Sequence, residues 1–538
     1  MAAVEQPKVA VIGLGAQGLV TVKNLLEEGF QVTGFDKNGY VGGIWHYSAE
    51  HRVSALPSTV VNVSRERASF TDFPFPDGTG SYPNAAEVDK YLNAYANAFN
   101  LHPHLRLSTA VQSITRDDAK NIWSITVQSL DSTQPETLEF HKLVMAIGPH
   151  SNPIYPHIAN QEVFGGEIVH SIAFKDPLHF MGKRVLVIGA SNTAADTCTS
   201  LVSIASKIYM SHRRGTVVLP RFLKNGTSLD HGGSYRIFQF QQNLDAYFPS
   251  QGQKFLDGFI ANIAREELGT LDPEWRFTPA PSLAHQNPTV SDTLVPALRA
   301  GKITSCAAPA RILDWQTIEL QDGSTVQADA IVCCTGYNLD LSILGPYDPT
   351  AKPGTHRDTP ALYQNIFSLD HPDSLAFVGI AITFNPAFLM ADLSSMALAQ
   401  LWSTKPSSPS LPLATEMQQW YDAHLRWVAG VRSRSPHGKF VKLTVRNGPW
   451  LVWVDEVSGT DVARNTSYSS IDAWRFWWRD RKLCGLLLGG IFSPHMYRLF
   501  ESGRRKRWDG AENAIKKVNE DVKESQRRKM EMKIEGRK

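Results

Sequence analysis

The sequence predicts an α/β protein with two Rossmann-like dinucleotide-binding domains, because two stretches repeat the order buried strand, glycine-rich turn, helix, second strand. The first stretch is KVAVIGLGAQGLVTVKNLLEEGFQVTGFD, residues 8–36, and the second is GKRVLVIGASNTAADTCTSLVSIASKIYMSHRRG, residues 182–215. A chain of 538 residues also exceeds the size at which a single hydrophobic core stops growing. We therefore expect at least two lobes that share an interface and can bury a large ligand.

The first glycine turn carries Gly13, Gly15 and Gly18 in the GxGxxG spacing. Gly13 permits the tight turn, Gly15 lets the main chain approach a pyrophosphate, and Gly18 lets the helix pack closely on the sheet. Asp36 ends the second strand, where a carboxylate can accept hydrogen bonds from both hydroxyl groups of an adenosine ribose. The alternative is a glycine-rich turn without a ligand. The complete unit favours a nucleotide site, and its acidic end suits FAD.

The second glycine turn departs from this pattern, because a serine replaces the middle glycine. Its predicted nucleotide-binding residues are Gly189, Ser191, Asn192, Thr193 and Ala194. Ser191 either moves the backbone away from a pyrophosphate or offers its hydroxyl group to it. The second strand of this unit ends in Arg213 and Arg214, which in isolation would be typical of a solvated surface turn. At this position in the unit, guanidinium groups indicate binding of the 2′-phosphate of NADPH.

The stretch between the two units, FGGEIVHSIAF, fits the pattern FxGxxxHxxx(Y/F) with Phe164, Gly166, His170 and Phe174. Six further motifs occur along the chain, in this order: GYVGGIWHY, STVVN, FTDFPFP, VCCTGY, SPHMYRLF and WDGAENAI. On these motifs, which run along almost the whole chain, the protein resembles the flavin-containing monooxygenase family. His170 is expected to position its surroundings and not to take part in chemistry.

The resemblance implies which residues lie beside the flavin. These are Gly43, Ile44 and Trp45 of GGIW, and Thr335 and Gly336 of CTGY. It also implies that Asn62, at the end of STVVN, is the catalytic residue, although an asparagine in a valine-rich stretch is more often a turn or a helix cap. A neutral amide donates and accepts at once, so it can orient a peroxide, a water molecule or the nicotinamide amide.

The activity implied by the resemblance is monooxygenation of a small organic substrate. NADPH reduces FAD, and the reduced flavin captures O2 as a C4a-hydroperoxide that delivers one oxygen atom. We expect N- or S-oxygenation, because Lys175 follows Phe174 where Baeyer–Villiger enzymes tend to have tryptophan and then proline or aspartate. The alternatives are a Baeyer–Villiger monooxygenase acting on a ketone, and an NADPH-dependent flavoprotein reductase or oxidase without oxygenation. The substrate itself cannot be inferred from the sequence.

The domain organisation follows from the same resemblance. Residues 1–178 and 331–402 are expected to form a discontinuous FAD-binding domain, with VQADAIVCCTGY returning to its sheet. Residues 179–330 are expected to form the inserted NADP-binding domain, with a helical insertion at about 222–296. Residues 403–538 are predicted to be a C-terminal extension that ends in a charged helix or frayed tail.

Composition narrows the remaining function classes. A formal net charge of +2 gives no reason to expect a nucleic-acid partner, and five scattered cysteines without a CxxC pair argue against a disulfide framework or a zinc site. The N-terminus lacks the features of a signal peptide, and the apolar run LCGLLLGGIF is too short to cross a membrane, so a cytoplasmic location and a buried element are expected. Residues 504–538 carry 13 basic and 7 acidic side chains, a net charge of +6, which indicates a solvated face and leaves peripheral membrane contact open. The oligomeric state stays open as well.

Overall fold

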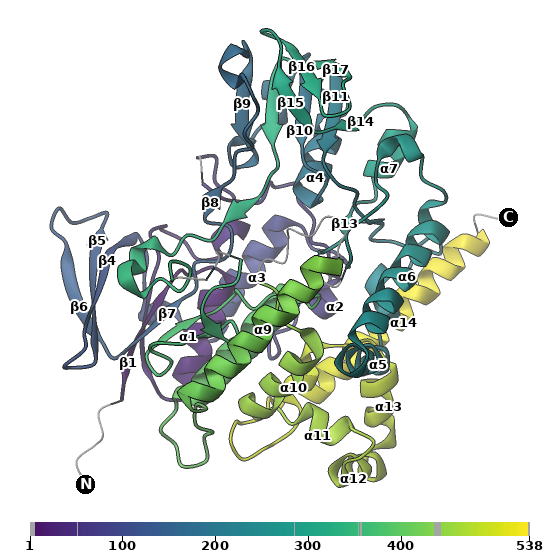
Figure 1. Ribbon diagram of the computed structural model, residues 1–538. Helices are drawn as coiled ribbons and strands as arrows, with labels where there is room; N and C mark the ends of the chain where they lie inside the picture. The colour runs from purple at the N-terminus through teal and green to yellow at the C-terminus, as the bar shows by residue number, and fades with distance from the viewer. Residues whose placement is uncertain are drawn as a thin grey trace.

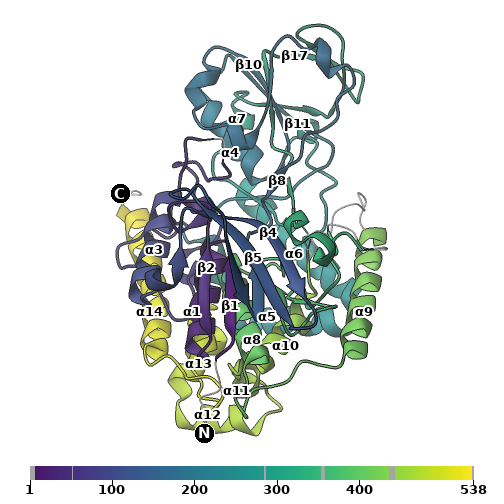
Figure 2. The ribbon, with the colours of Figure 1, turned by 90° about the vertical axis from the view of Figure 1, so that its left-hand side faces the viewer.

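The computed structural model describes residues 6–50, 52–283, 286–352, 355, 358–434 and 443–535. Two lobes are built around two separate sheets. The first lobe contains the N-terminal glycine unit and the second lobe contains the other glycine unit, and Figure 1 shows the first lobe below the second. Figure 2, turned by 90°, shows the same separation, with β1 and β2 in the lower lobe and β10 and β11 in the upper one. The predicted α/β class with two Rossmann-like units is confirmed.

The first lobe contains a seven-stranded sheet in the order β20-β21-β22-β7-β1-β2-β3. Its strands are β1 Lys8–Ile12, β2 Gln31–Phe35, β3 Leu105–Arg106, β7 Lys142–Met145, β20 Leu362–Tyr363, β21 Phe367–Ser368 and β22 Leu375–Phe377. β1 pairs in parallel with both β2 and β7, and α1 (Ala16–Glu27) connects β1 to β2. Residues 9–12 are buried on both faces, which explains why this parallel strand is an uninterrupted apolar run.

The second lobe contains a five-stranded parallel sheet in the order β14-β11-β10-β18-β9. Its strands are β9 Glu167–His170, β10 Arg184–Ile188, β11 Lys207–His212, β14 Thr304–Ala307 and β18 Ala330–Cys333. The helix α4 (Asn192–Leu201) connects β10 to β11 and completes the second glycine unit.

Two predicted domain boundaries are wrong in this sheet. The strand of VQADAIVCCTGY, β18, was expected in the first sheet, but it pairs with β10 on one side and β9 on the other. β9 was likewise expected in the first domain, yet it forms the edge of the second sheet. The residues of β18 are all buried, and a short apolar strand of this kind fits the interior of either parallel sheet. The chain returns to the first sheet only at β20–β22.

Smaller sheets surround these two. Antiparallel strands β4 Thr109–Asp117, β5 Ile122–Ser129 and β6 Glu136–Phe140 form one, and β15 Pro309–Ile312, β16 Thr317–Leu320 and β17 Thr325–Gln327 form another. Two-stranded pairs are formed by β8 Asn152–Pro153 with β19 Tyr337–Asn338, and by β12 Val218–Leu219 with β13 Thr289–Val290.

Two helices lie within the segment 222–296 that was predicted to be a helical insertion. They are α5 (Tyr235–Tyr247) and α6 (Pro249–Leu268), and α7 (Leu294–Arg299) follows them. The shorter helices α2 (Arg65–Ala68) and α3 (Ala85–Ala98) belong to the first lobe, where a reciprocal capping box between Asn84 and Glu87 starts α3.

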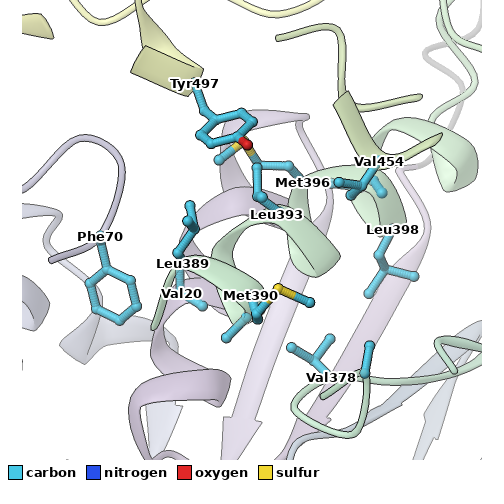
Figure 3. Close-up of a cluster of buried hydrophobic side chains, with 14 of the residues drawn as sticks. Val20, Phe70, Val378, Leu389, Met390, Leu393, Met396, Leu398, Val454 and Tyr497 are labelled. Atoms are coloured by element: carbon cyan, nitrogen blue, oxygen red, sulfur yellow. The ribbon is translucent and has the colours of Figure 1, made fainter. Parts of the chain in front are cut away.

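The C-terminal third is helical and packs into the core of the first lobe. Its helices are α8 Ala387–Trp402, α9 Ala414–Arg434, α10 Asn447–Ser458, α11 Val462–Thr466, α12 Ile471–Arg479, α13 Arg481–Gly489 and α14 Ala511–Glu535. Figure 3 shows Leu393 and Met396 of α8 beside Val20 of α1, Val454 of α10 and Tyr497. The described helices after residue 403 that contribute to this cluster therefore pack into the core of this lobe.

Buried charges reinforce this attachment. Lys23 of α1 contacts Asp72, and Arg505 donates to Glu27 at 2.5 Å and to Asn24 at 2.7 Å. Burial alone would raise the pKa of Glu27, but the positive charges of Arg505, Lys23 and Arg498 hold it well below its usual range. Removing one partner would leave an uncompensated buried charge, so this network favours a fixed C-terminal segment.

The apolar run at Leu483 forms α13, whose Leu483, Cys484 and Leu487 are buried, as expected. The basic segment near the C-terminus forms α14, whose Ala511 and Ile515 are also buried, so the predicted charged helix has one packed face. Within the described ranges, none of the helices combines the length and the apolar character needed to cross a membrane.

Candidate active site

A cavity of about 1540 Å³ lies against the first glycine turn and extends to the helices of the insertion. The sequence-predicted residues that line it are Gly13, Gly15, Asp36, Gly43, Ile44, Trp45, Asn62, Asn192 and Gly336. Its other walls come from α5, α6, and the beginnings of α8 and α10, and they include the aromatic side chains of Phe238, Phe384 and Phe388. The structure therefore brings most of the residues expected at FAD together with Asn62 in one space, and the exceptions are Gly18 and Thr335.

Close backbone contacts require glycine at Gly13 of the first turn and at Gly43 of the GGIW motif. Gly13 has φ +95°, and a Cβ atom there would lie 2.6 Å from the carbonyl oxygen of Ala146. Gly43 has φ +58°, and its Cβ atom would lie 2.9 Å from Cα of Gly15. The turn and the GGIW motif thus pack glycine on glycine at the cavity wall, where the absence of side chains leaves main chain accessible to a bound group.

Gly18 does not line the cavity, because it packs inside the turn. A Cβ atom there would lie 1.8 Å from the carbonyl oxygen of Gly13. This contact is the close packing of the helix that its place in the fingerprint predicts.

Asp36 follows β2 and holds the same turn from its other side. One carboxylate oxygen accepts a hydrogen bond from the Leu14 backbone N–H at 2.8 Å, and the other accepts one from the Asn38 N–H at 2.9 Å. Burial raises the pKa of Asp36 even though these N–H donors favour its charged form. A carboxylate oxygen can accept more than one hydrogen bond, so Asp36 can fix the turn and still accept from a ligand hydroxyl group.

Asn62 is held by a residue that the sequence did not single out. Nη2 of Arg221 donates to Oδ1 of Asn62 at 2.9 Å and to the Val60 carbonyl oxygen at 2.9 Å, while its Nε donates to the Val61 carbonyl oxygen at 3.0 Å. Because a guanidinium group has no acceptor, the oxygen of the Asn62 amide must be the atom that faces it. The NH2 group of Asn62 is then the part of this amide that can donate to a bound molecule.

Arg221 is itself fixed on several sides. Its backbone N–H donates to Oδ1 of Asp292 at 2.8 Å, and its carbonyl oxygen accepts from the Tyr82 hydroxyl group at 2.7 Å. Its side chain is almost fully buried and pairs with Asp292 at 3.4 Å. No short motif marks this residue, since its partners Asn62 and Tyr82 lie more than a hundred positions away in the chain.

The second glycine turn meets the cavity at one residue only. Asn192 lines the cavity, and its side-chain oxygen accepts from the Val290 N–H at 2.8 Å. Position 189 requires glycine, because φ is +143° and an added Cβ atom would lie 2.6 Å from the Cys334 carbonyl oxygen. Ala194 is fully buried, whereas Ser191 and Thr193 are exposed.

The two arginines after β11 are not among the residues that line the cavity. Arg213 is exposed and Arg214 is half-buried, and burial together with the charge of Arg213 lowers the pKa of Arg214. They stand at the carboxyl end of a strand next to β10, as the second unit predicts. The contact of these two arginines with a 2′-phosphate stays a prediction. The same holds for the nucleotide contacts predicted for Gly189, Ser191, Thr193 and Ala194.

The CTGY turn is anchored by a buried histidine. Nδ1 of His170 accepts from the Ile172 N–H at 3.2 Å, so the proton sits on Nε2, which donates to the Gly336 carbonyl oxygen at 3.1 Å. Burial lowers the pKa of His170 and keeps it neutral. Thr335 donates its hydroxyl group to the Ile154 carbonyl oxygen and does not line the cavity. These contacts agree with a positioning role for His170.

Comparison with known proteins places the chain in one family. The family model for flavin-binding monooxygenase-like proteins matches residues 6–534. Monooxygenase aurF of Gibberella zeae is 41% identical over 525 residues, which cover 96% of this chain and 98% of that protein. Flavin-containing monooxygenase 3 of Rattus norvegicus is 26% identical over 525 residues, which cover 94% of this chain and 91% of that protein.

Solved structures show the same fold. S-allyl-L-cysteine S-oxygenase from Allium sativum has a TM-score of 0.63 at 19% identity, covering 96% of this chain and 99% of that one. Cyclohexanone monooxygenase from Rhodococcus sp. Phi1 bound to NADP⁺ has a TM-score of 0.58 at 19% identity, covering 84% of this chain and 98% of that one. The predicted family and cofactors are thus confirmed: the chain belongs to the flavin-binding monooxygenase-like family and is a flavin-dependent monooxygenase that uses FAD and NADPH.

Proposed function

We propose that the enzyme transfers one oxygen atom of O2 to a nitrogen or sulfur atom of a small organic molecule. The observation that carries this proposal is the Asn62 amide, which lines a large, mostly apolar cavity and whose oxygen is fixed by Arg221. A fixed neutral amide offers a directed hydrogen-bond donor without adding charge to the site.

The residues of the first turn fit FAD. Gly13, Gly15 and Gly43 leave room for main chain to approach a diphosphate, and Asp36 stands where a ribose would be read. When bound, FAD supplies the reduction and oxygen-activation chemistry. In this proposal Asn62 donates to a group at the reacting end of the flavin, while Trp45 and Phe388, in edge-to-face contact at 6.4 Å, help to exclude water.

NADPH is assigned to the second glycine turn. We propose that Gly189, Ser191, Asn192, Thr193 and Ala194 form its phosphate-binding turn, and that Arg213 and Arg214 pair with its 2′-phosphate. Support comes from their place beside β10 and from the cyclohexanone monooxygenase structure of the same fold, which holds NADP⁺. Asn192 then stands where this nucleotide would enter the cavity.

One segment favours nitrogen or sulfur over a ketone carbon as the oxygen acceptor. Phe174 and Lys175 stand where Baeyer–Villiger enzymes tend to differ. Here Nζ of Lys175 donates to the Arg52 carbonyl oxygen at 2.8 Å and to Ser54 Oγ at 2.7 Å, which ties this segment to the first lobe.

The test is to supply NADPH and ¹⁸O2 with sets of tertiary amines, sulfides and ketones, and to compare NADPH consumption with product mass. One ¹⁸O atom in an amine or sulfide product supports the proposal. Lactone or ester formation from ketones alone would replace it with Baeyer–Villiger oxidation. Hydrogen peroxide as the only product would instead identify an oxidase.

The role of Asn62 is tested by Asn62→Ala. FAD content should stay the same, because the glycine turn and Asp36 hold the other end of the cofactor, but NADPH consumption should separate from product formation. A variant that purifies without flavin, or that forms product at the wild-type rate, would show that Asn62 has a different role.

A further inference from the structure

The helix α12 presents an unusual set of side chains to solvent. Ile471, Trp474 and Trp478 are 71%, 54% and 68% exposed, and they follow each other at spacings of three and four residues, so they share one side of the helix. Trp477 and Tyr468 extend this surface. A cluster of exposed tryptophans is rare on a soluble surface and marks an interaction site.

The opposite side of α12 fixes it to the body of the protein. Phe476 is only 3% exposed and packs edge-to-face on Phe500, with ring centroids 5.2 Å apart. The hydroxyl oxygen of Ser470 caps the first turn by accepting from the Asp472 N–H at 3.2 Å. The tryptophans are therefore displayed by an anchored helix and are not the result of a frayed segment.

Basic side chains surround the aromatic cluster. Between residues 464 and 482 there are five basic and two acidic side chains, a net charge of +3. Arg475 and Arg479 are exposed next to the tryptophans, and the guanidinium group of Arg481 stands 4.4 Å from the Trp477 ring centroid and 4.9 Å from that of Trp478. The surface thus combines amphipathic aromatic rings with positive charge.

The position of α12 makes this surface accessible. Both Figure 1 and Figure 2 show α12 at the end of the molecule that is farthest from the second lobe. A flat surface could contact it without meeting the cavity or the second glycine turn.

We propose that α12 docks the enzyme on an anionic lipid surface. Tryptophan prefers the headgroup level of a bilayer, where its ring is buried and its edge stays wet, and arginine pairs with lipid phosphate. A second copy of this chain would bring the same arginines face to face, so like charges disfavour that occupant. Because no helix in the described part of the chain is suited to span a bilayer, the contact is with the membrane surface.

The test is flotation of the full-length holoenzyme with vesicles of phosphatidylcholine, with or without phosphatidylserine. The wild type should bind the phosphatidylserine vesicles, and binding should weaken as salt increases. Arg475→Glu with Arg479→Glu should reduce partitioning at least about 25-fold, at about fivefold for each lost positive charge. Trp474→Ser with Trp478→Ser should reduce it at least about tenfold through lost apolar burial.

Two control variants separate α12 from other surfaces. Trp315→Ser removes a tryptophan that is 63% exposed in the second lobe and should leave binding unchanged. Lys506→Glu with Lys523→Glu reverses two exposed charges of the basic C-terminal segment and should also have little effect. Quenching of tryptophan fluorescence by brominated lipids should be lost only in the α12 variants.

The proposal is overturned if the wild type does not bind these vesicles, or if the α12 variants bind as well as the wild type. It is also overturned if the wild type forms a dimer without lipid that the tryptophan variant abolishes, since α12 would then contact a second copy. Unchanged product formation from a soluble substrate by the α12 variants would show that they remain folded.

Discussion

Replacing Arg221 should separate cofactor binding from productive oxygenation. In Arg221→Met, the Asn62 amide and the Val60 and Val61 carbonyl oxygens lose donors at 2.9, 2.9 and 3.0 Å. The amide can then rotate, and its donor no longer has a fixed direction. A displacement of about 1 Å in a reacting geometry can lower a rate by about 100-fold. We therefore expect product formation to fall by one to two orders of magnitude while FAD stays bound.

The free energy of unfolding of this variant should fall as well. Each lost hydrogen bond contributes about 1 kcal/mol net, which gives on the order of 3 kcal/mol for the contacts to residues 60–62. The side chain of Asp292 is 37% exposed, so its charge keeps contact with water when its partner is removed. Arg221→Lys keeps the charge but not the planar fork, and it should have an intermediate effect on coupling.

The assay measures product formed per NADPH consumed, hydrogen peroxide released and flavin bound per protein. Arg311→Met is the matched control, because Arg311 pairs with Glu319 on an exposed antiparallel sheet of the second lobe. Coupling in this control should equal that of the wild type. If Arg221→Met keeps wild-type coupling while Asn62→Ala loses it, Arg221 does not position Asn62. If it loses FAD together with activity, its role is structural.

Three further predictions concern the two glycine turns and one buried histidine. Gly43→Ala should lose FAD, because its Cβ atom would lie 2.9 Å from Gly15 Cα. The control is Gly78→Ala, which has φ +85° and no atom within 4 Å of the added Cβ atom, so it carries only the conformational strain of a positive φ. Equal flavin content in both variants would refute this prediction. Arg213→Ala with Arg214→Ala should weaken reduction by NADPH about tenfold more than reduction by NADH, as measured in single turnovers, and an equal loss for both would assign these arginines to the fold. Burial lowers the pKa of His424 to about 4 from 6.5, so the unfolded chain binds the extra proton as the pH falls between these values. The free energy of unfolding should therefore decline by at most about 3 kcal/mol as the pH falls below 6.5. Urea unfolding near neutral pH and at about pH 5 measures this decline, which should be smaller in His424→Gln.

The parts of the fold that the sequence predicted are those with local causes. Each glycine unit places its strand, turn and helix within about thirty residues, and the φ values of Gly13 and Gly189 show why those residue types were needed. No local feature of the sequence determines which sheet β18 joins, since a buried strand can pair with any open sheet edge of matching register. The sequence therefore predicts that β18 is a strand, but its pairing partners are defined only once the second lobe is assembled.

The predicted site divides in the same way. Gly43, Ile44, Trp45 and Asn62 were predicted from motif resemblance, and all of them line the same cavity. The exposed aromatic side of α12 was hidden in the sequence, because the tryptophans of IDAWRFWWRD are as consistent with a buried helix as with a surface. Only packing shows that Phe476 takes the inner side and leaves Trp474 and Trp478 outside.

Arg221 shows most clearly why a residue that holds a proposed catalytic side chain can escape sequence reasoning. The Ala190 carbonyl oxygen of the second glycine turn accepts from the Thr289 hydroxyl group at 2.7 Å, and Thr289 begins the β13 strand that pairs with β12. β12 leads directly to Arg221, whose guanidinium group reaches Asn62. An unbroken series of short contacts therefore connects the turn assigned to NADPH with the amide assigned to oxygenation, although the residues it joins lie up to about 160 positions apart in the chain. Each contact in this series joins residues that are distant in the sequence or belong to different elements, so no local motif could have indicated that Arg221 lies between the two proposed sites.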